Sequence, residues 1–184
     1  MALFSLEHSA LAYRADFALY GTASVTMAAV MMTAGPADQR VALTLLALLG
    51  LASWTLIEYL LHRFVLHGLQ PFSQWHSAHH QRPTALICTP ALFSAGLIVT
   101  LVFLPAFLWA GGWRACALTF GVVLGYLGYA VAHHATHHWR SDTPWVKRRK
   151  YWHALHHRAG LRPSHFGVTT AFWDRVLGSD GRLS

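Results

Sequence analysis

Histidine is the residue type in this sequence with the clearest chemical meaning. The 184 residues hold 14 histidines against 7 acidic side chains. Most of the histidines lie in four short groups, which read HRFVLH, HSAHH, HHATHH and HALHH in chain order. A neutral imidazole is the commonest side-chain ligand for transition metals, so this concentration predicts metal binding.

The spacing within the groups fits helices. Residues three or four apart on an α-helix are neighbours, so HSAHH and HALHH would each present one patch of imidazoles. The histidines of HRFVLH, His62 and His67, are five apart. We therefore expect their side chains to be splayed and to approach a metal from different angles.

An exposed metal-scavenging tract is the alternative interpretation. Such a tract has consecutive histidines in a polar, flexible segment. Here the groups have apolar or aromatic neighbours, and hydrophobic segments separate them. We therefore interpret most of these histidines as ligands. Because about ten ligands exceed the four or five that one ion takes, two metal ions are expected.

Four apolar segments must position the histidines, and they cover about residues 17–34, 41–61, 91–110 and 115–132. Each has the length of a helix that crosses a bilayer. The chain is 54% hydrophobic and 11% charged, whereas soluble domains are about a quarter charged. We predict an all-α integral membrane protein, with 1–184 as a single domain. A cleaved signal peptide is the alternative for the first segment, although its length favours a retained span.

The basic residues predict the orientation in the membrane. Nine of the fourteen Lys and Arg residues follow residue 139, and the positive-inside rule then places both termini in the cytoplasm. The histidine segments, 62–85 and 133–184, follow the second and fourth spans on that same side. Beside membrane spans, a basic tail favours anionic lipid as its partner, and we expect no nucleic acid.

The order HxxxxH, HxxHH, HxxxH, HxxHH resembles that of the fatty acid hydroxylase / sterol desaturase superfamily. The runs WTLIEYLLHRFVLH (54–67) and FGVTTAFWDRVLG (166–178) are also similar to that family. The resemblance implies four membrane helices under a cytosolic helical cap that carries a histidine-bound dimetal centre. The ligands it implies are His62, His67, His76, His79, His80, His133, His137, His153, His156 and His157.

Three histidines depart from the family pattern. His134 and His138 are surplus to it, and an alternative register would use them in place of His133 and His137. His165 stands where family members often have Asn. It is an extra ligand, a hydrogen-bond donor behind a ligand, or a neutral variation, and we favour the donor.

The resemblance also implies cofactors and partners. Hydroxylation of an unactivated C–H bond needs a redox metal with an open position, so iron is expected in the active form, with dioxygen as co-substrate. Zinc also suits imidazole and would be inert to redox in a purified sample. The substrate is a lipid from the bilayer. Sixteen residues before the first span leave no room for the haem-binding domain of many 2-hydroxylases, so a separate electron-donor protein is expected.

Two acidic residues near the histidines have different expected roles. Glu58 lies inside the second span, where a carboxylate is costly unless it is paired. We expect it to accept the outer N–H of His62 or of a neighbouring ligand. The alternative is a hydrogen bond to Tyr59, Arg63 or a tail group. Asp174 is expected to cap or pair locally rather than to bind metal.

A basic run and a set of glycines each have two alternative interpretations, one structural and one functional. The run Lys147–Lys150 is either an ordinary cytoplasmic anchor or a docking patch for an acidic electron donor or for anionic lipid headgroups. The glycines of the fourth span, Gly121, Gly125 and Gly128, either line an acyl tunnel or form a helix-packing surface, and the packing surface is favoured.

The predicted function is a membrane-bound di-iron oxygenase that hydroxylates a lipid acyl chain with dioxygen and external electrons. A sterol or lipid desaturase and a carotenoid ring hydroxylase are alternatives with the same chemistry. Outside the enzyme class, a metal transporter or sensor is the alternative. A transporter needs ligands along a path within the spans, whereas these histidines gather at one face.

Overall fold

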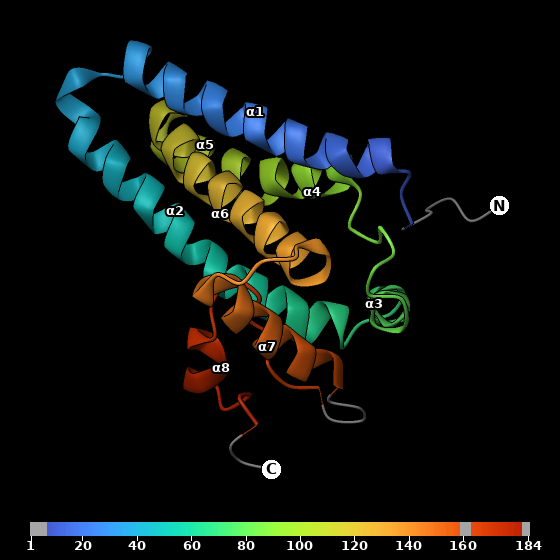
Figure 1. Ribbon diagram of the computed structural model, residues 1–184. Helices are drawn as coiled ribbons and strands as arrows, with labels where there is room; N and C mark the ends of the chain where they lie inside the picture. The colour runs from blue at the N-terminus through green and yellow to red at the C-terminus, as the bar shows by residue number, and fades with distance from the viewer. Residues whose placement is uncertain (1–6, 159–162, 182–184) are drawn as a thin grey trace. The chain divides into compact units, whose positions relative to one another are not determined.

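The computed structural model describes residues 7–158 and 163–181, and every regular element in that part of the chain is helical (Figure 1). The predicted all-α fold is thereby confirmed. The α-helices are α1 (Ala10–Ala34), α2 (Arg40–Leu60), α3 (Phe72–Gln81), α4 (Ala91–Ile98), α5 (Leu104–Ala110), α6 (Gly112–His138), α7 (Pro144–Arg158) and α8 (Phe172–Val176). A short 3-10 turn, η1 (Ala37–Gln39), joins α1 to α2, and two π-helical turns, η2 (Leu61–Leu66) and η3 (Val99–Phe103), lengthen α2 and α4.

Four helical segments are long and apolar enough to cross a membrane. They are Ala10–Ala34, Ala37–Leu66, Ala91–Ala110 and Gly112–His138. Large apolar side chains along them remain open, among them Leu92, Leu108 and Trp109 at 83% exposure or more. Lipid can cover such side chains, and a helix satisfies its own backbone hydrogen bonds in the bilayer. The chain is a multi-pass membrane protein.

The chain forms two compact units. One holds residues 1–54 and 88–127, and the other holds residues 55–87 and 128–184. The first unit is built from α1, α4, α5 and most of α2 and α6. The second contains the last part of α2 with η2, the last part of α6, and α3, α7 and α8. All ten predicted ligands belong to the second unit.

In the first unit, α1 lies beside α4 and is tied to it by a buried hydrogen bond (Figure 1). The hydroxyl groups of Tyr20 and Ser94 are 2.7 Å apart. The third span is interrupted by η3, and Pro105 follows at the start of α5. Proline lacks an N–H and disturbs the preceding turn of a helix, which accounts for the position of this interruption.

Helices α2 and α6 approach closely in the first unit because glycines face the contact. A Cβ atom on Gly121 would collide with the Ala47 carbonyl and would lie 2.7 Å from the Leu51 nitrogen. A Cβ on Gly125 would overlap the Trp54 side chain. Gly121 and Gly125 therefore form a packing surface, as favoured from the sequence. Gly128, whose Cβ would meet nothing within 4 Å, does not share that role.

Candidate metal centre

The ten predicted ligands come from four helical segments of the second unit. Turn η2 and the residue after it supply His62 and His67, and α3 supplies three histidines. The last two turns of α6 and the second half of α7 supply the others.

Turn η2 brings His62 and His67 together, so the expectation that they are splayed was wrong. On an α-helix, residues five apart point in different directions. Here the His67 N–H donates to the His62 carbonyl at 3.2 Å, which is the i to i+5 hydrogen bond of a π-helix. The wider turn brings the two rings onto the same side, with centroids 5.3 Å apart and planes tilted by 39°.

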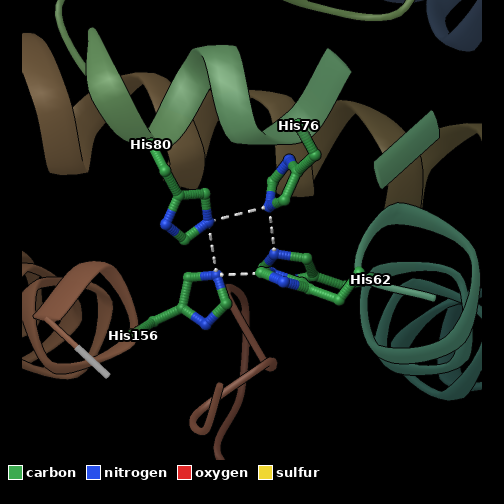
Figure 2. A group of neighbouring side chains, drawn as sticks. His62, His76, His80 and His156 are labelled. Carbon is green, nitrogen blue, oxygen red and sulfur yellow. Dashed lines mark hydrogen bonds between the residues drawn. The ribbon is translucent and has the colours of Figure 1, made fainter. Parts of the chain in front are cut away.

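The first cluster, called here the five-histidine group, is His62, His67, His76, His80 and His156. Each offers one ring nitrogen, and these nitrogens all lie within 4.8 Å of one another. The Nε2 atom of His76 is 3.0 Å from those of His62 and His80. Figure 2 shows four of these rings with nitrogens turned toward a common centre. Two nitrogens bound to one ion at about 2.0–2.1 Å, at right angles, are roughly 3 Å apart, so this spacing suits a shared metal ion.

The second cluster, called here the four-histidine group, is His79, His133, His137 and His153, and it obeys the same 4.8 Å limit. Nε2 atoms are 3.2 Å apart between His133 and His79, and 2.7 Å apart between His153 and His137.

The tenth predicted ligand, His157, adjoins both groups. Its Nε2 is 3.1 Å from that of His153 in the four-histidine group. Its ring stacks on His80 of the five-histidine group with centroids 4.2 Å apart. All ten predicted residues are thus brought together.

The alternative register with His134 and His138 is not the one that the structure forms. The rings of His134 and His138 stack on each other with centroids 4.6 Å apart. Among the described residues, neither His134 nor His138 belongs to one of the two histidine groups, whereas His133 and His137 belong to the four-histidine group.

Burial keeps the clustered imidazoles neutral. Burial, and after it the neighbouring His157, lowers the pKa of His67 and of His80 to about 4. The pKa of His76 and of His156 is lowered well below the usual value by burial and then by nearby histidines. A neutral ring has a free lone pair at neutral pH, which is the form that binds a metal.

Two ligands of the five-histidine group are held from behind by backbone carbonyls. His62 Nδ1 is 2.6 Å from the Phe166 oxygen, and His156 Nδ1 is 2.7 Å from the Ser164 oxygen. A carbonyl oxygen can only accept a hydrogen bond, so Nδ1 donates in both rings. The Nε2 lone pair of each ring is then directed at the cluster.

Glu58 does not contact His62 in the predicted way. Its Oε1 accepts the backbone N–H groups of Val168 at 2.6 Å and of Thr169 at 2.9 Å, and its Oε2 accepts the Thr169 hydroxyl at 2.6 Å. The outer nitrogen of His62 is already occupied by the Phe166 carbonyl. The expected bond to a ligand was therefore wrong, and the alternative, a tail group, is correct.

Asp174 has a role that the sequence analysis missed. It is 0% exposed, and its Oδ1 and Oδ2 accept the N–H groups of Phe166 at 2.7 Å and Gly167 at 2.9 Å. Its Oδ1 also accepts the Ser179 hydroxyl at 2.8 Å. A carboxylate inside the mostly apolar run AFWDRV needs several hydrogen-bond donors. That need was the signal in the sequence from which this role could have been inferred. Together with Glu58 it accepts all four N–H groups of residues 166–169, called here the clamped segment.

His165 lies behind the site and not at a ligand position. Its ring stacks on Trp152 with centroids 5.0 Å apart, and its Nδ1 is 2.9 Å from the Ser164 hydroxyl. Its backbone φ is 58°, in the left-handed region. The residue therefore turns the chain between the two carbonyls that hold His156 and His62, rather than donating to a ligand.

The basic run Lys147–Lys150 is partly engaged inside the second unit. Arg149 is 8% exposed and donates to the Thr169 carbonyl at 2.8 Å. Lys147 pairs with Asp142 at 2.9 Å, and Lys150 donates to the Trp139 carbonyl. Arg149 is thus a structural partner of the clamped segment rather than part of a surface patch.

Four apolar spans and two partly buried histidine clusters define the class of this molecule. It is a multi-pass membrane protein with a histidine site that can hold metal ions. The chain belongs to the fatty acid hydroxylase family, whose model matches residues 47–179. This agrees with the resemblance seen in the histidine motifs.

The curated relatives that the chain matches are named as fatty acid or ceramide hydroxylases. The chain is 34% identical over 154 residues to the ceramide very long chain fatty acid hydroxylase scs7 of Schizosaccharomyces pombe, covering 74% of this chain and 42% of that protein. It is 33% identical over 145 residues to the dihydroceramide fatty acyl 2-hydroxylase FAH2 of Arabidopsis thaliana, covering 73% of this chain and 60% of that protein. The chain therefore spans less than two thirds of the length of these relatives.

A solved structure has the same fold. It is full-length scs7p with only the hydroxylase domain visible, and the TM-score is 0.75. The match covers 95% of this chain and 68% of that one at 24% sequence identity. The likeness supports the helical architecture.

Proposed function

We propose that this chain is a lipid hydroxylase that holds two metal ions, one in each histidine group, with iron in the active form. The observation that carries the proposal is the convergence of ten imidazoles into two adjoining clusters. Each cluster offers at least four nitrogen donors, enough for one ion. The same ligands would accept zinc in a purified sample, without redox activity.

The chain supplies the ligands and their alignment, and bound iron would supply the redox chemistry that hydroxylation with dioxygen requires. The clustered histidines are buried or half-buried and neutral, so they bind a cation without first losing protons. The carbonyls of Ser164 and Phe166 hold two rings in the ligating tautomer. Electrons would come from a separate donor protein.

The proposed substrate is the acyl chain of a ceramide-like lipid that enters from the bilayer. The matched relatives are named as hydroxylases of ceramide or dihydroceramide fatty acyl chains, which favours hydroxylation over desaturation. Residues 1–184 would act as one domain, with the metal centre and both termini on the cytoplasmic side. The exposed cations near Lys147 would meet anionic lipid headgroups.

A metal transporter is less well supported by the positions of the ligands. The ten histidines all belong to the second unit, whereas the first unit contains most of the apolar spans. Transport needs coordinating groups along the whole path across the membrane.

The test is metal analysis followed by turnover with labelled dioxygen. Purified protein in lipid nanodiscs should contain two metals per chain. After loading with iron and addition of a reductase system, a ceramide should gain one ¹⁸O atom from ¹⁸O₂ by mass spectrometry. His153→Ala should lower the metal content and abolish the product, whereas Asp142→Asn at the surface should do neither. A metal-free wild-type protein, or label incorporated from water, would contradict the proposal.

A further inference from the structure

The two histidine groups differ in what lies behind their rings. In the five-histidine group, His62 and His156 donate from Nδ1 to the Phe166 and Ser164 carbonyls. In the four-histidine group, no protein group of residues 7–158 and 163–181 accepts a hydrogen bond from Nδ1 of His79 or His153, although both atoms are buried. Outer partners fix the orientation of a ligating ring and raise its basicity. The tail therefore supports two rings of the five-histidine group, while the buried outer nitrogens of His79 and His153 have no such support from the described residues.

The position of the Phe166 carbonyl depends on two carboxylates that lie away from the rings. Asp174 accepts the N–H groups of Phe166 and Gly167, and Glu58 accepts those of Val168 and Thr169. Both carboxylates are at most 3% exposed. In a buried site, charge-assisted hydrogen bonds of this kind are strong and directional. Movement of the clamped segment would carry the Phe166 carbonyl away from His62.

We propose that Glu58 and Asp174 are positioning residues that control how tightly the five-histidine group retains its metal ion, while the four-histidine group is unaffected. The coupling runs from each carboxylate to the clamped segment, and from the Phe166 carbonyl to the His62 ring. The inference rests on the proposed function, because both groups must hold metal.

The two carboxylates differ in whether an amide can replace them, and this difference allows a specific test of the proposal. Both N–H donors to Glu58 reach the same oxygen, Oε1, while Oε2 receives a hydroxyl that can reverse and accept. A glutamine amide can therefore satisfy all three contacts. In Asp174 each oxygen receives an N–H group that cannot reverse, so an asparagine amide must leave one donor unpaired.

The experiment compares Glu58→Gln, Glu58→Leu and Asp174→Asn in purified protein loaded with zinc. Metal content and release to a chromophoric chelator are measured for each. Wild type and Glu58→Gln should retain two ions. Glu58→Leu and Asp174→Asn should hold one ion as before and bind the other roughly 10- to 100-fold more weakly, the usual effect of losing an outer partner. Asp142→Asn is the matched control for an aspartate at the surface.

Double variants assign the weakened ion to a group. Asp174→Asn combined with His76→Ala should resemble His76→Ala alone, since both act on the five-histidine group. Asp174→Asn combined with His137→Ala should leave no tightly held ion. Circular dichroism and thermal melting of the metal-free variants check that the helices form. If Asp174→Asn does not fold, the comparison of Glu58→Leu with Glu58→Gln still tests the proposal.

Several results would overturn the inference. Equal weakening of both ions by Asp174→Asn would show a general loss of structure. Equal weakening of the same ion by Glu58→Gln and Glu58→Leu would show that charge, and not hydrogen bonding, matters. Retention of both ions by Asp174→Asn and Glu58→Leu would refute the inference and leave the proposed function standing, whereas a wild type without metal would end both.

Discussion

The backbone conformation at His165 explains which residue types are favoured at this position. A φ of 58° is costly for most side chains, and asparagine is among the few that adopt it readily. The family that the sequence resembles often has asparagine at this position, and a left-handed turn accounts for that preference. Histidine is also tolerated in this region, and its ring finds a place against Trp152.

We predict that His165→Asn keeps most of the stability while His165→Val does not. Valine is β-branched and suffers most in the left-handed region, so it should lose about 1–2 kcal/mol relative to asparagine. Thermal unfolding in detergent measures the difference. Equal melting temperatures for the two variants would mean that the turn can relax without strain.

The pH dependence of the metal-free protein follows from its buried imidazoles. The pKa of His67 and of His80 is about 4 in the folded state and about 6.5 in an unfolded chain. Between these values the unfolded chain binds more protons, so stability should fall as pH drops from about 6.5 toward 4 and should be flat above 7. Melting of chelator-treated protein across this range tests the sign. A melting temperature that is constant or rises on acidification would contradict it.

At the scale of the elements, hydrophobic segments predicted the helices, while their irregular turns were not foreseen. The four spans occur where the apolar segments are, because length and hydropathy suffice to define a membrane helix. The π-helical turn η2 has no comparable local signal. It follows from the packing of its histidines into a shared cluster, which only the folded chain reveals.

The contact between α2 and α6 should be intolerant of side chains at Gly121. We predict that Gly121→Ala lowers the melting temperature because its Cβ would collide with the backbone of α2. Overpacking of this kind costs about 1–3 kcal/mol. Gly96→Ala is the control, since a Cβ there meets nothing within 4 Å and alanine favours helix. Equal melting of the two variants would argue against the close approach.

At the scale of the whole molecule, the membrane class and the gathering of the ten histidines were predictable, and the hydrogen bonds behind the histidine rings were not. The histidine motifs are local patterns with helical spacing. The clamped segment, in contrast, joins residues that are 110 positions apart, as in the bond from Val168 to Glu58. No periodicity in the sequence encodes such a pairing, so the expected partner of Glu58 was wrong.

Metal removal should affect the two units unequally. The second unit contains all ten proposed ligands, whereas the first is held by helix packing and by the Tyr20–Ser94 bond. After chelation, hydrogen exchange should rise in α3 and α7 and stay unchanged in α1 and α4. Exchange that rises uniformly along the chain would show that the units unfold together.

The π-helical turn has a consequence for how the gene can vary. Loss of one codon between His62 and His67 would restore an ordinary HxxxH repeat and a regular α-helix, and both imidazoles would still share a face. Residues after the deletion would keep nearly their present direction, because the wider turn absorbs the extra residue locally, but they would move along the helix axis by about 1.5 Å, the rise of one residue. The extra residue thus sets how far the following histidines stand from the end of α2.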